Sequence, residues 1–310
     1  MLEGSLKRQI NLAIPVYTII IIMTVAGAIG SEYFRTLNNY HNIIYRVAAI
    51  AIVSLGQTVV MLAGGIDLSV GNVLALSSCI LATYNTSFGL FPTILVTLII
   101  GLLIGVINGF GETKLGVPPM VMTLATMSIA KGLSLLIRPT PGGSIPYGMY
   151  KFFDYKWGLL SFPLILILLL GSTLFLIIHC TKFGRYIFCI GGNKLNAKKN
   201  GIPIVKIKIT SYAICGLLAA IAGIIMSVRI SSGDALIGET FALDSITAVV
   251  IGGTAMMGGE GGIVGTLGGA LLIAMISNFL NLLGINPMTQ YIIKGLILVI
   301  ALAGKVKKSD

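Results

Sequence analysis

The sequence predicts an all-α integral membrane protein, a polytopic bundle of about ten transmembrane helices that includes short helices broken by glycine. Only 10% of the 310 residues are charged and 56% are hydrophobic, whereas soluble domains carry about 25% charged residues. So few charges could not cover a soluble fold of this size. The 39 glycines favour closely packed membrane helices. A soluble enzyme, a disordered chain and a disulfide-stapled secreted domain are excluded, and residues 1–310 are expected to form a single membrane domain.

Apolar runs place the helices along the chain. A spanning helix needs roughly 20 apolar residues. Within two of the runs, glycines recur at every fourth residue, as at Gly101, Gly105 and Gly109, so that a neighbouring backbone can pack closely against that face. In chain order, helices are expected over 10–29, 43–63, 70–84, 91–110, 120–137, 159–178, 207–228, 241–257, 263–283 and 288–303.

Two of these segments, 70–84 and 241–257, are short and adjoin glycine-rich breaks. The break before the first reads AGGIDLSVG, and the break at the end of the second reads IGGTAMMGGEGG. Interrupted segments in corresponding places of two halves can line a transport pathway, because broken backbone at membrane depth is tolerated only against protein or a water-filled cavity. A tight turn between helices is the alternative.

The loops set the expected orientation. The loop 181–208 holds seven Lys or Arg residues and no acidic residue, which predicts a cytoplasmic position. Both chain ends are also basic, so we expect them on the same side, and ten spans satisfy that arrangement. The segment 138–158 then lies outside. The formal charge of +11 therefore reflects membrane orientation, and no nucleic-acid partner is expected. The basic end residues are Lys7, Arg8, Lys305, Lys307 and Lys308.

The basic loop carries start and stop signals for one short helix. Asn193 is suited to cap the first turn, the helix would run through Lys199, and Gly201 would end it. A positively charged cytoplasmic helix between two spans can dock into a groove of a partner. A solvated connection with no partner is the alternative.

Neutral polar side chains inside the spans are candidates for a substrate pathway. Such groups suit an uncharged, polyhydroxylated cargo better than an ion or a lipid. Each of them alone could instead form a hydrogen bond between helices. The candidates are Gln57, Thr58, Asn72, Asn108, Thr123, Asn278 and Asn281.

Two acidic residues lie near the starts of the short segments. Asp67 precedes 70–84, and Asp244 lies near the start of 241–257. A carboxylate at a helix N-terminus is favoured by the helix dipole, so we expect both residues to be structural caps. Buried carboxylates along a path are typical of ion-driven carriers, and their scarcity here disfavours that class.

No motif indicates catalysis, a metal or a cofactor. The phosphate-binding pattern GxxxxGK[ST] is absent, so the chain is not expected to bind or hydrolyse ATP. Two histidines and four cysteines without C-x-x-C spacing do not predict a metal site. We therefore expect a transport subunit without enzymatic activity, catalytic residue, metal or cofactor.

Several stretches together resemble a known family. They are GRYIF-x-x-GGN with the following NGI and KIKI, GGIDLSVGNVLAL, VPPMVMTLATMSIAKGL, LDSITAVVIGGT, GGIVGTLGGALL and NLLGINPMTQYIIKG. In this order they are similar to the ribose-type permease subunits of bacterial ATP-binding cassette (ABC) importers, within the branched-chain amino acid/ribose permease superfamily. The resemblance covers roughly 40–300.

The resemblance implies a multi-pass subunit of the bacterial cytoplasmic (inner) membrane that imports ribose or a similar monosaccharide. Two permease copies, identical or related, would form the pathway within the lipid. A partner ATPase would use ATP, and a periplasmic or lipid-anchored binding protein would deliver the sugar. The loop 181–208 would be the cytoplasmic coupling loop, and the residues assigned to ATPase coupling are Gly184, Arg185, Gly191, Gly192, Asn193, Lys199, Asn200, Gly201 and Ile202.

Two kinds of alternative stay open from the sequence. The same machinery could carry a nucleoside, a furanose-like signal or a branched-chain amino acid. A self-sufficient secondary carrier or channel is a different class. The basic loop combined with the missing ATP site favours a chain that works with a separate ATPase.

Overall fold

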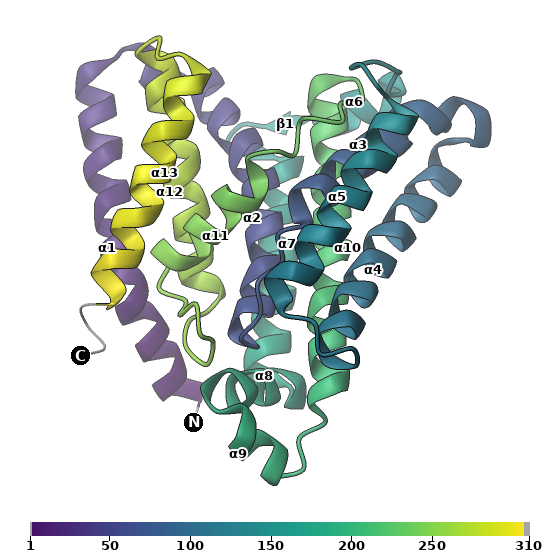
Figure 1. Cartoon of the computed structure of the whole chain (residues 1–310). Helices are drawn as coiled ribbons and strands as arrows, with labels where there is room; N and C mark the ends of the chain where they lie inside the picture. Colours follow the sequence, from purple (N-terminus) through teal and green to yellow (C-terminus); the bar gives the residue numbers. More distant parts are fainter. Residues whose placement is uncertain (1, 307–310) are drawn as a thin grey trace.

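The computed structural model describes residues 2–306, and all ten expected segments are helices within it (Figure 1). Their bounds differ from expectation by up to eight residues, the largest difference being at the start of the first helix, which begins at Leu2 instead of residue 10. The ten are α1 (Leu2–Gly30), α2 (Leu37–Leu62), α3 (Val70–Phe88), α4 (Leu90–Thr113), α5 (Pro119–Ile137), α7 (Phe162–Cys180), α10 (Ile204–Ile230), α11 (Phe241–Ile251), α12 (Ile263–Leu282) and α13 (Pro287–Val306). The loops carry η1 (Tyr33–Arg35), α6 (Tyr147–Phe153), α8 (Lys182–Gly192) and α9 (Lys194–Lys199), with the antiparallel pair β1 (Lys156–Trp157) and β2 (Leu160–Ser161).

The all-α membrane fold is confirmed, but the number of full-length spans is lower than expected. Among the described residues, seven helices are long and apolar enough to cross a membrane: α1, α2, α4, α5, α7, α10 and α12. Helix α11 has 11 residues because Gly252 and Gly253 end it early, the latter at φ +97°. Polar residues such as Asn72 and Asn85 lower the hydropathy of α3.

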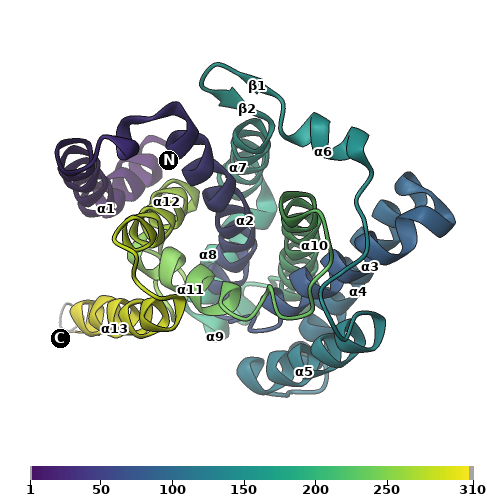
Figure 2. The same cartoon turned by 90° about the horizontal axis from the view of Figure 1, so that it is seen from above.

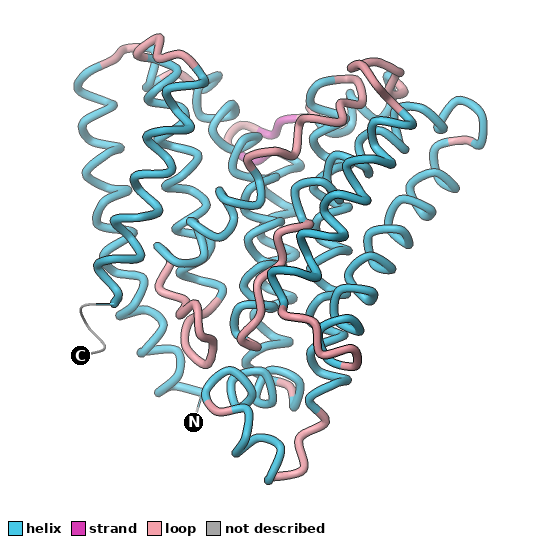
Figure 3. The backbone as a smooth tube through the Cα atoms, in the orientation of Figure 1, coloured by secondary structure: helices cyan, strands magenta, loops and turns pink. Residues whose placement is uncertain are grey.

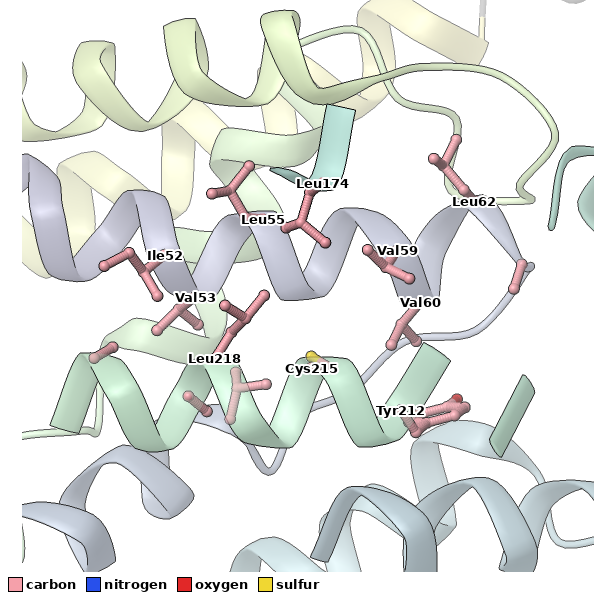
Figure 4. Packing of buried hydrophobic residues seen from close by; sticks show 14 of the residues in the cluster. Ile52, Val53, Leu55, Val59, Val60, Leu62, Leu174, Tyr212, Cys215 and Leu218 are labelled. Carbon is pink, nitrogen blue, oxygen red and sulfur yellow. The ribbon is translucent and has the colours of Figure 1, made fainter. Parts of the chain in front are cut away.

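Helices α2 and α10 form the centre of the bundle. Figure 2 shows them surrounded by the other helices, with α1, α12 and α13 on one side and α3, α4 and α5 on the other. Their contact is filled by fully buried side chains such as Val53, Val60 and Cys215 (Figure 4). Helix α4 also packs on α10 through glycine, as expected: a Cβ added to Gly105 would overlap the backbone of Tyr212.

The helices run alternately between two ends of the molecule. Helices α8 and α9 mark one end, here called the α9 end, and α6 with the two strands marks the opposite α6 end (Figure 1). Helix α1 starts at the α9 end and α13 runs toward it, as expected for two chain ends on one side. The basic residues Lys307 and Lys308 lie outside the described residues. The two glycine-rich breaks are loops inside the bundle, between α2 and α3 and between α11 and α12 (Figure 3).

Candidate transport and coupling sites

Helices α8 and α9 form a hairpin that covers the α9 end of the bundle. Helix α8 turns one face inward, with Gly184, Ile187 and Ile190 buried. Asn193 ends α8 and caps α9, because its side-chain oxygen accepts the backbone N–H of Asn196 at 2.9 Å. The hairpin therefore holds α9 in a defined orientation against the bundle.

The predicted end of α9 is also confirmed. Gly201 adopts φ +73°, in the left-handed region that favours glycine. The backbone N–H groups of Gly201 and Ile202 donate to the carbonyls of Lys198 and Ala197, each at 3.1 Å. These bonds satisfy carbonyls that a helix end leaves free, so the loop is a fixed turn.

The outer face of α9 is basic with one apolar side chain. Lys194, Lys198 and Lys199 are exposed, and Leu195 is 72% exposed, whereas Ala197 is buried against the bundle. A cleft of about 730 Å³ runs beside α9, lined by Lys194, Lys198, Ile202 and residues at the start of α10. Of the other residues assigned to coupling, Arg185, Gly192 and Asn200 are exposed, while Gly184 is buried.

The break between α2 and α3 holds a buried polar cluster, here called the Asp67 cluster (Asp67, Ser69, Asn108 and Thr126). The Asp67 carboxylate accepts the Ser69 hydroxyl at 2.6 Å and the Ser69 backbone N–H at 2.9 Å. The Asn108 amide donates to the Ser69 oxygen at 2.9 Å, and Thr126 donates to the Asn108 oxygen at 2.6 Å. Asp67 lies two residues before Ser69, the N-cap of α3, and its carboxylate bonds Ser69 instead of the N–H groups of the first turn. Through Asn108 and Thr126 the cluster links the break to α4 and α5.

Two further pathway candidates lie around the same break. The carboxamide of Gln57 faces the backbone of Asp67, at 3.1 Å from the carbonyl oxygen and 3.2 Å from the nitrogen. The Thr123 hydroxyl lies 3.5 Å from the carbonyl oxygen of Ile66. Both side chains are fully buried. Gln57, Asn108 and Thr123 are thus brought together by the break, although they lie far apart in the chain.

The remaining pathway candidates lie elsewhere. The Thr58 hydroxyl is 2.6 Å from that of Thr266 on α12, and the Asn72 amide donates to the Met127 carbonyl of α5 at 3.1 Å. Asn278 donates to the Asn39 side chain at 2.9 Å, and Asn281 accepts from Gln290 at 2.7 Å. Each candidate has a partner within the chain, so their contact with a cargo stays a prediction.

Two buried ion pairs join helices that the sequence did not pair. Asp244 was expected to cap α11, but the N-cap position is Thr240. Asp244 lies inside the first turn of the helix, and its carboxylate accepts Lys294 of α13 at 2.8 Å. Lys208 of α10 pairs with Glu112 of α4, near the α9 end. Opposite charges within or beside separate apolar segments were the available signal, but their pairing depends on how the helices pack.

A polar cleft of about 450 Å³ opens at the α6 end and was not expected. Its lining includes Asn38, Asn42, Tyr45 and Arg229, together with a buried His41 whose two ring nitrogens have no hydrogen-bond partner. The polar run NNYHN at 38–42 was its only sequence signal. Within 2–306, no three His, Cys, Asp or Glu side chains are grouped as a metal site would require.

The apolar helical bundle and the basic helical hairpin fixed to one end together define the class of this protein, which is a membrane transport subunit. The chain belongs to the family described as "Branched-chain amino acid transport system / permease component", whose model matches residues 39–302. The resemblance to ribose-type permease subunits of ABC importers is thereby confirmed. The chain is a multi-pass protein of the bacterial inner membrane.

The similarity to known proteins extends over nearly the whole chain. The ribose import permease protein RbsC of Bacillus subtilis is 38% identical, covering 95% of this chain and 92% of the relative. RbsC of Escherichia coli K12 is 35% identical, with 94% and 92% covered. The fructose import permease protein FrcC of Rhizobium meliloti is 32% identical, with 94% and 84% covered. No solved structure matches the chain.

Proposed function

We propose that the chain is the membrane-spanning permease subunit of an ABC importer that carries ribose, or a closely similar monosaccharide, into the cytoplasm. The observation that carries the proposal is 38% identity to a ribose import permease over 95% of the chain. The fructose import permease is less similar, at 32%. The neutral amide and hydroxyl groups of the Asp67 cluster and its surroundings suit a polyhydroxylated cargo.

We further propose that α9 is the docking element for a partner ATPase, which places the α9 end in the cytoplasm. The exposed lysines would complement an acidic surface, and such charge complementarity sets docking orientation. Leu195 would enter an apolar pocket, as buried anchors of interfaces do. The capped ends of α9 keep it in one orientation, so binding does not have to order the helix first.

The remaining partners follow from the same proposal. A periplasmic or lipid-anchored binding protein delivers the sugar at the α6 end. A second permease, identical or related, completes the pathway beside α5, α11 and α13, where apolar side chains such as Leu136, Leu243 and Ile292 are exposed. ATP is hydrolysed only by the partner, because this sequence has no phosphate-binding loop, and the permease itself needs no cofactor.

One set of experiments tests both the identity of the cargo and the docking of the ATPase on α9. Cells expressing the permease with its ATPase and binding protein are given labelled ribose, with excess fructose, a nucleoside or leucine as competitor. Unlabelled ribose should compete most strongly. A photoreactive residue in place of Leu195 should cross-link to the ATPase, whereas one in place of Tyr147, 76% exposed at the α6 end, should not. Equal competition by leucine would contradict the cargo, and no ATPase cross-link from Leu195 would contradict the docking.

A further inference from the structure

The end of α8 contacts both glycine-rich breaks at one place, here called the glycine junction (62–64, 191–192 and 257–259). Residues 62–64 end α2, 191–192 end α8 immediately before α9, and 257–259 lie between α11 and α12. The backbone N–H of Gly259 donates to the carbonyl of Leu62 at 3.1 Å. Three segments that are distant in the chain are therefore joined through their backbones.

The glycine junction has no space for side chains, so it requires glycine. A Cβ added to Gly191 would overlap the Leu62 carbonyl oxygen and the Gly259 nitrogen. A Cβ added to Gly258 would lie 2.7 Å from the Gly64 nitrogen and 2.9 Å from the Gly191 Cα. Gly64, Gly258 and Gly259 also have φ between +72° and +90°, which disfavours residues with side chains.

Backbone contact of this kind transmits displacement without side-chain rearrangement. Closely packed protein interiors have low compressibility and pass strain to their neighbours. Only Asn193 separates the end of α8 from α9, and the end of α8 contacts both breaks. One break leads within a few residues to the Asp67 cluster. The other connects α11, which carries the Asp244–Lys294 pair, to α12.

We propose that the glycine junction is a positioning element that couples α9 to both broken segments, so that ATPase closure moves them together. The proposal rests on the docking role of α9 proposed above. A static role, in which the glycines only let α8 pack on the bundle, is the competing explanation. The two differ in what happens to transport when the junction is altered and the ATPase stays bound.

The first test compares Gly191→Ala with Gly30→Ala. Both residues lie within the last two positions of a helix, but a Cβ at Gly30 meets no atom within 4 Å. Each variant is purified with its ATPase and binding protein. We expect Gly191→Ala to retain ATPase binding within twofold of the wild type while sugar transport falls at least tenfold, and Gly30→Ala to transport within twofold. Full transport by Gly191→Ala would overturn the proposal.

The second test does not depend on the folding of Gly191→Ala. Spin labels are placed at Lys182→Cys on α8 and at Met257→Cys, which is 86% exposed, with Cys180 and Cys189 replaced by Ser. The distance between the labels is measured in the complex before and after the ATPase is trapped closed. Each label is also paired in turn with a label at Tyr147→Cys, 76% exposed at the α6 end. An unchanged distance between the first two labels, with both shifting relative to Tyr147→Cys, supports a junction that moves as one body. A shift of several ångströms between the first two labels, or no movement of either relative to Tyr147→Cys, would overturn the proposal. An ATPase that fails to bind the wild-type permease would instead refute the docking role of α9.

Discussion

Lys294 and Asp244 form an ion pair within the bundle, with Nζ of Lys294 at 2.8 Å from the Asp244 carboxylate. The pair joins α11 to α13, and the side chains are only 16% and 7% exposed. Arg46 of α2 adds a further positive charge near Asp244. Charges at membrane depth are costly, so the pairing explains how α11 retains a carboxylate there.

Breaking this pair is expected to destabilise the fold. Asp244→Asn leaves Lys294 without its partner, and loss of one member of a buried pair costs about 3–5 kcal/mol. The double variant Asp244→Asn/Lys294→Gln removes both charges and should recover most of that loss. Chemical unfolding in detergent measures the differences. The exposed pair Lys131–Glu239 is the control, because Glu239→Gln should cost less than about 1 kcal/mol. A double variant as unstable as Asp244→Asn would contradict the pairing.

Asn108 is expected to hold the break between α2 and α3 in place. Asn108→Leu removes the amide that donates to the Ser69 oxygen and to the second oxygen of the Asp67 carboxylate. A buried polar group that loses its partner costs about 1–3 kcal/mol. The unfolding free energy should fall accordingly, and transport should fall with it. Ser128→Ala is the control, because Ser128 bonds only its own helix at the carbonyl of Leu124. Equal stability of the two variants would rule out this role.

The two glycines Gly105 and Gly132 should respond oppositely to alanine. A Cβ at Gly105 would overlap the Tyr212 carbonyl of α10, whereas a Cβ at Gly132 meets no atom within 4 Å. Alanine is favoured over glycine inside helices by up to about 1 kcal/mol, so Gly132→Ala should be neutral or stabilising. Gly105→Ala should lower the thermal unfolding midpoint and the amount of protein in the membrane. Similar midpoints for the two variants would show that α4 does not pack tightly on α10.

The end of α9 should matter more than its charges. Gly201→Val places a β-branched residue at φ +73°, and left-handed backbone costs roughly 1–2 kcal/mol outside glycine. Transport and permease-stimulated ATP hydrolysis should fall together, whereas Lys199→Ala should change both less, since an exposed ion pair contributes about 1 kcal/mol or less. Membrane insertion is checked by fractionation. Full coupling in Gly201→Val would indicate that the loop is only a solvated connection.

The two ends of the molecule should label from opposite sides of the membrane. Cysteine placed at Lys198 should react with an impermeant reagent only in inside-out vesicles, and cysteine at Tyr147 only in intact cells. Replacing Cys180 and Cys189, the two exposed cysteines, by Ser removes the background. Labelling of Lys198→Cys in intact cells would overturn the orientation.

Local signals predicted much of this fold. The apolar runs predicted all ten helices, because burial in lipid or protein follows hydropathy. The ends of α9 were predicted from Asn193 and Gly201, since capping and left-handed turns depend on adjacent residues. Helix ends were less accurate. Helix α7 starts at Phe162 instead of Leu159 because the preceding residues pair as β1 and β2.

Contacts between distant segments could not be predicted in the same way. The Asp67 cluster requires α4 and α5 to pack beside the break, and the Asp244–Lys294 pair requires α13 to lie against α11. The glycine junction joins residues near 62, 191 and 258, and a single sequence gives no spacing that would pair them. The seven pathway candidates were chosen as polar residues in apolar runs, and that criterion does not separate cargo contacts from bonds between helices.

We propose that this chain passes sugar through the membrane when a partner ATPase acts on α9. The most direct measurement is uptake of labelled ribose by proteoliposomes that contain the permease, its ATPase and the sugar-loaded binding protein. Uptake should require ATP and all three components, and Gly201→Val should reduce it while the ATPase stays active. Ribose uptake at the same rate without the ATPase, driven by an ion gradient, would show that the chain is a secondary carrier instead of a subunit that depends on an ATPase.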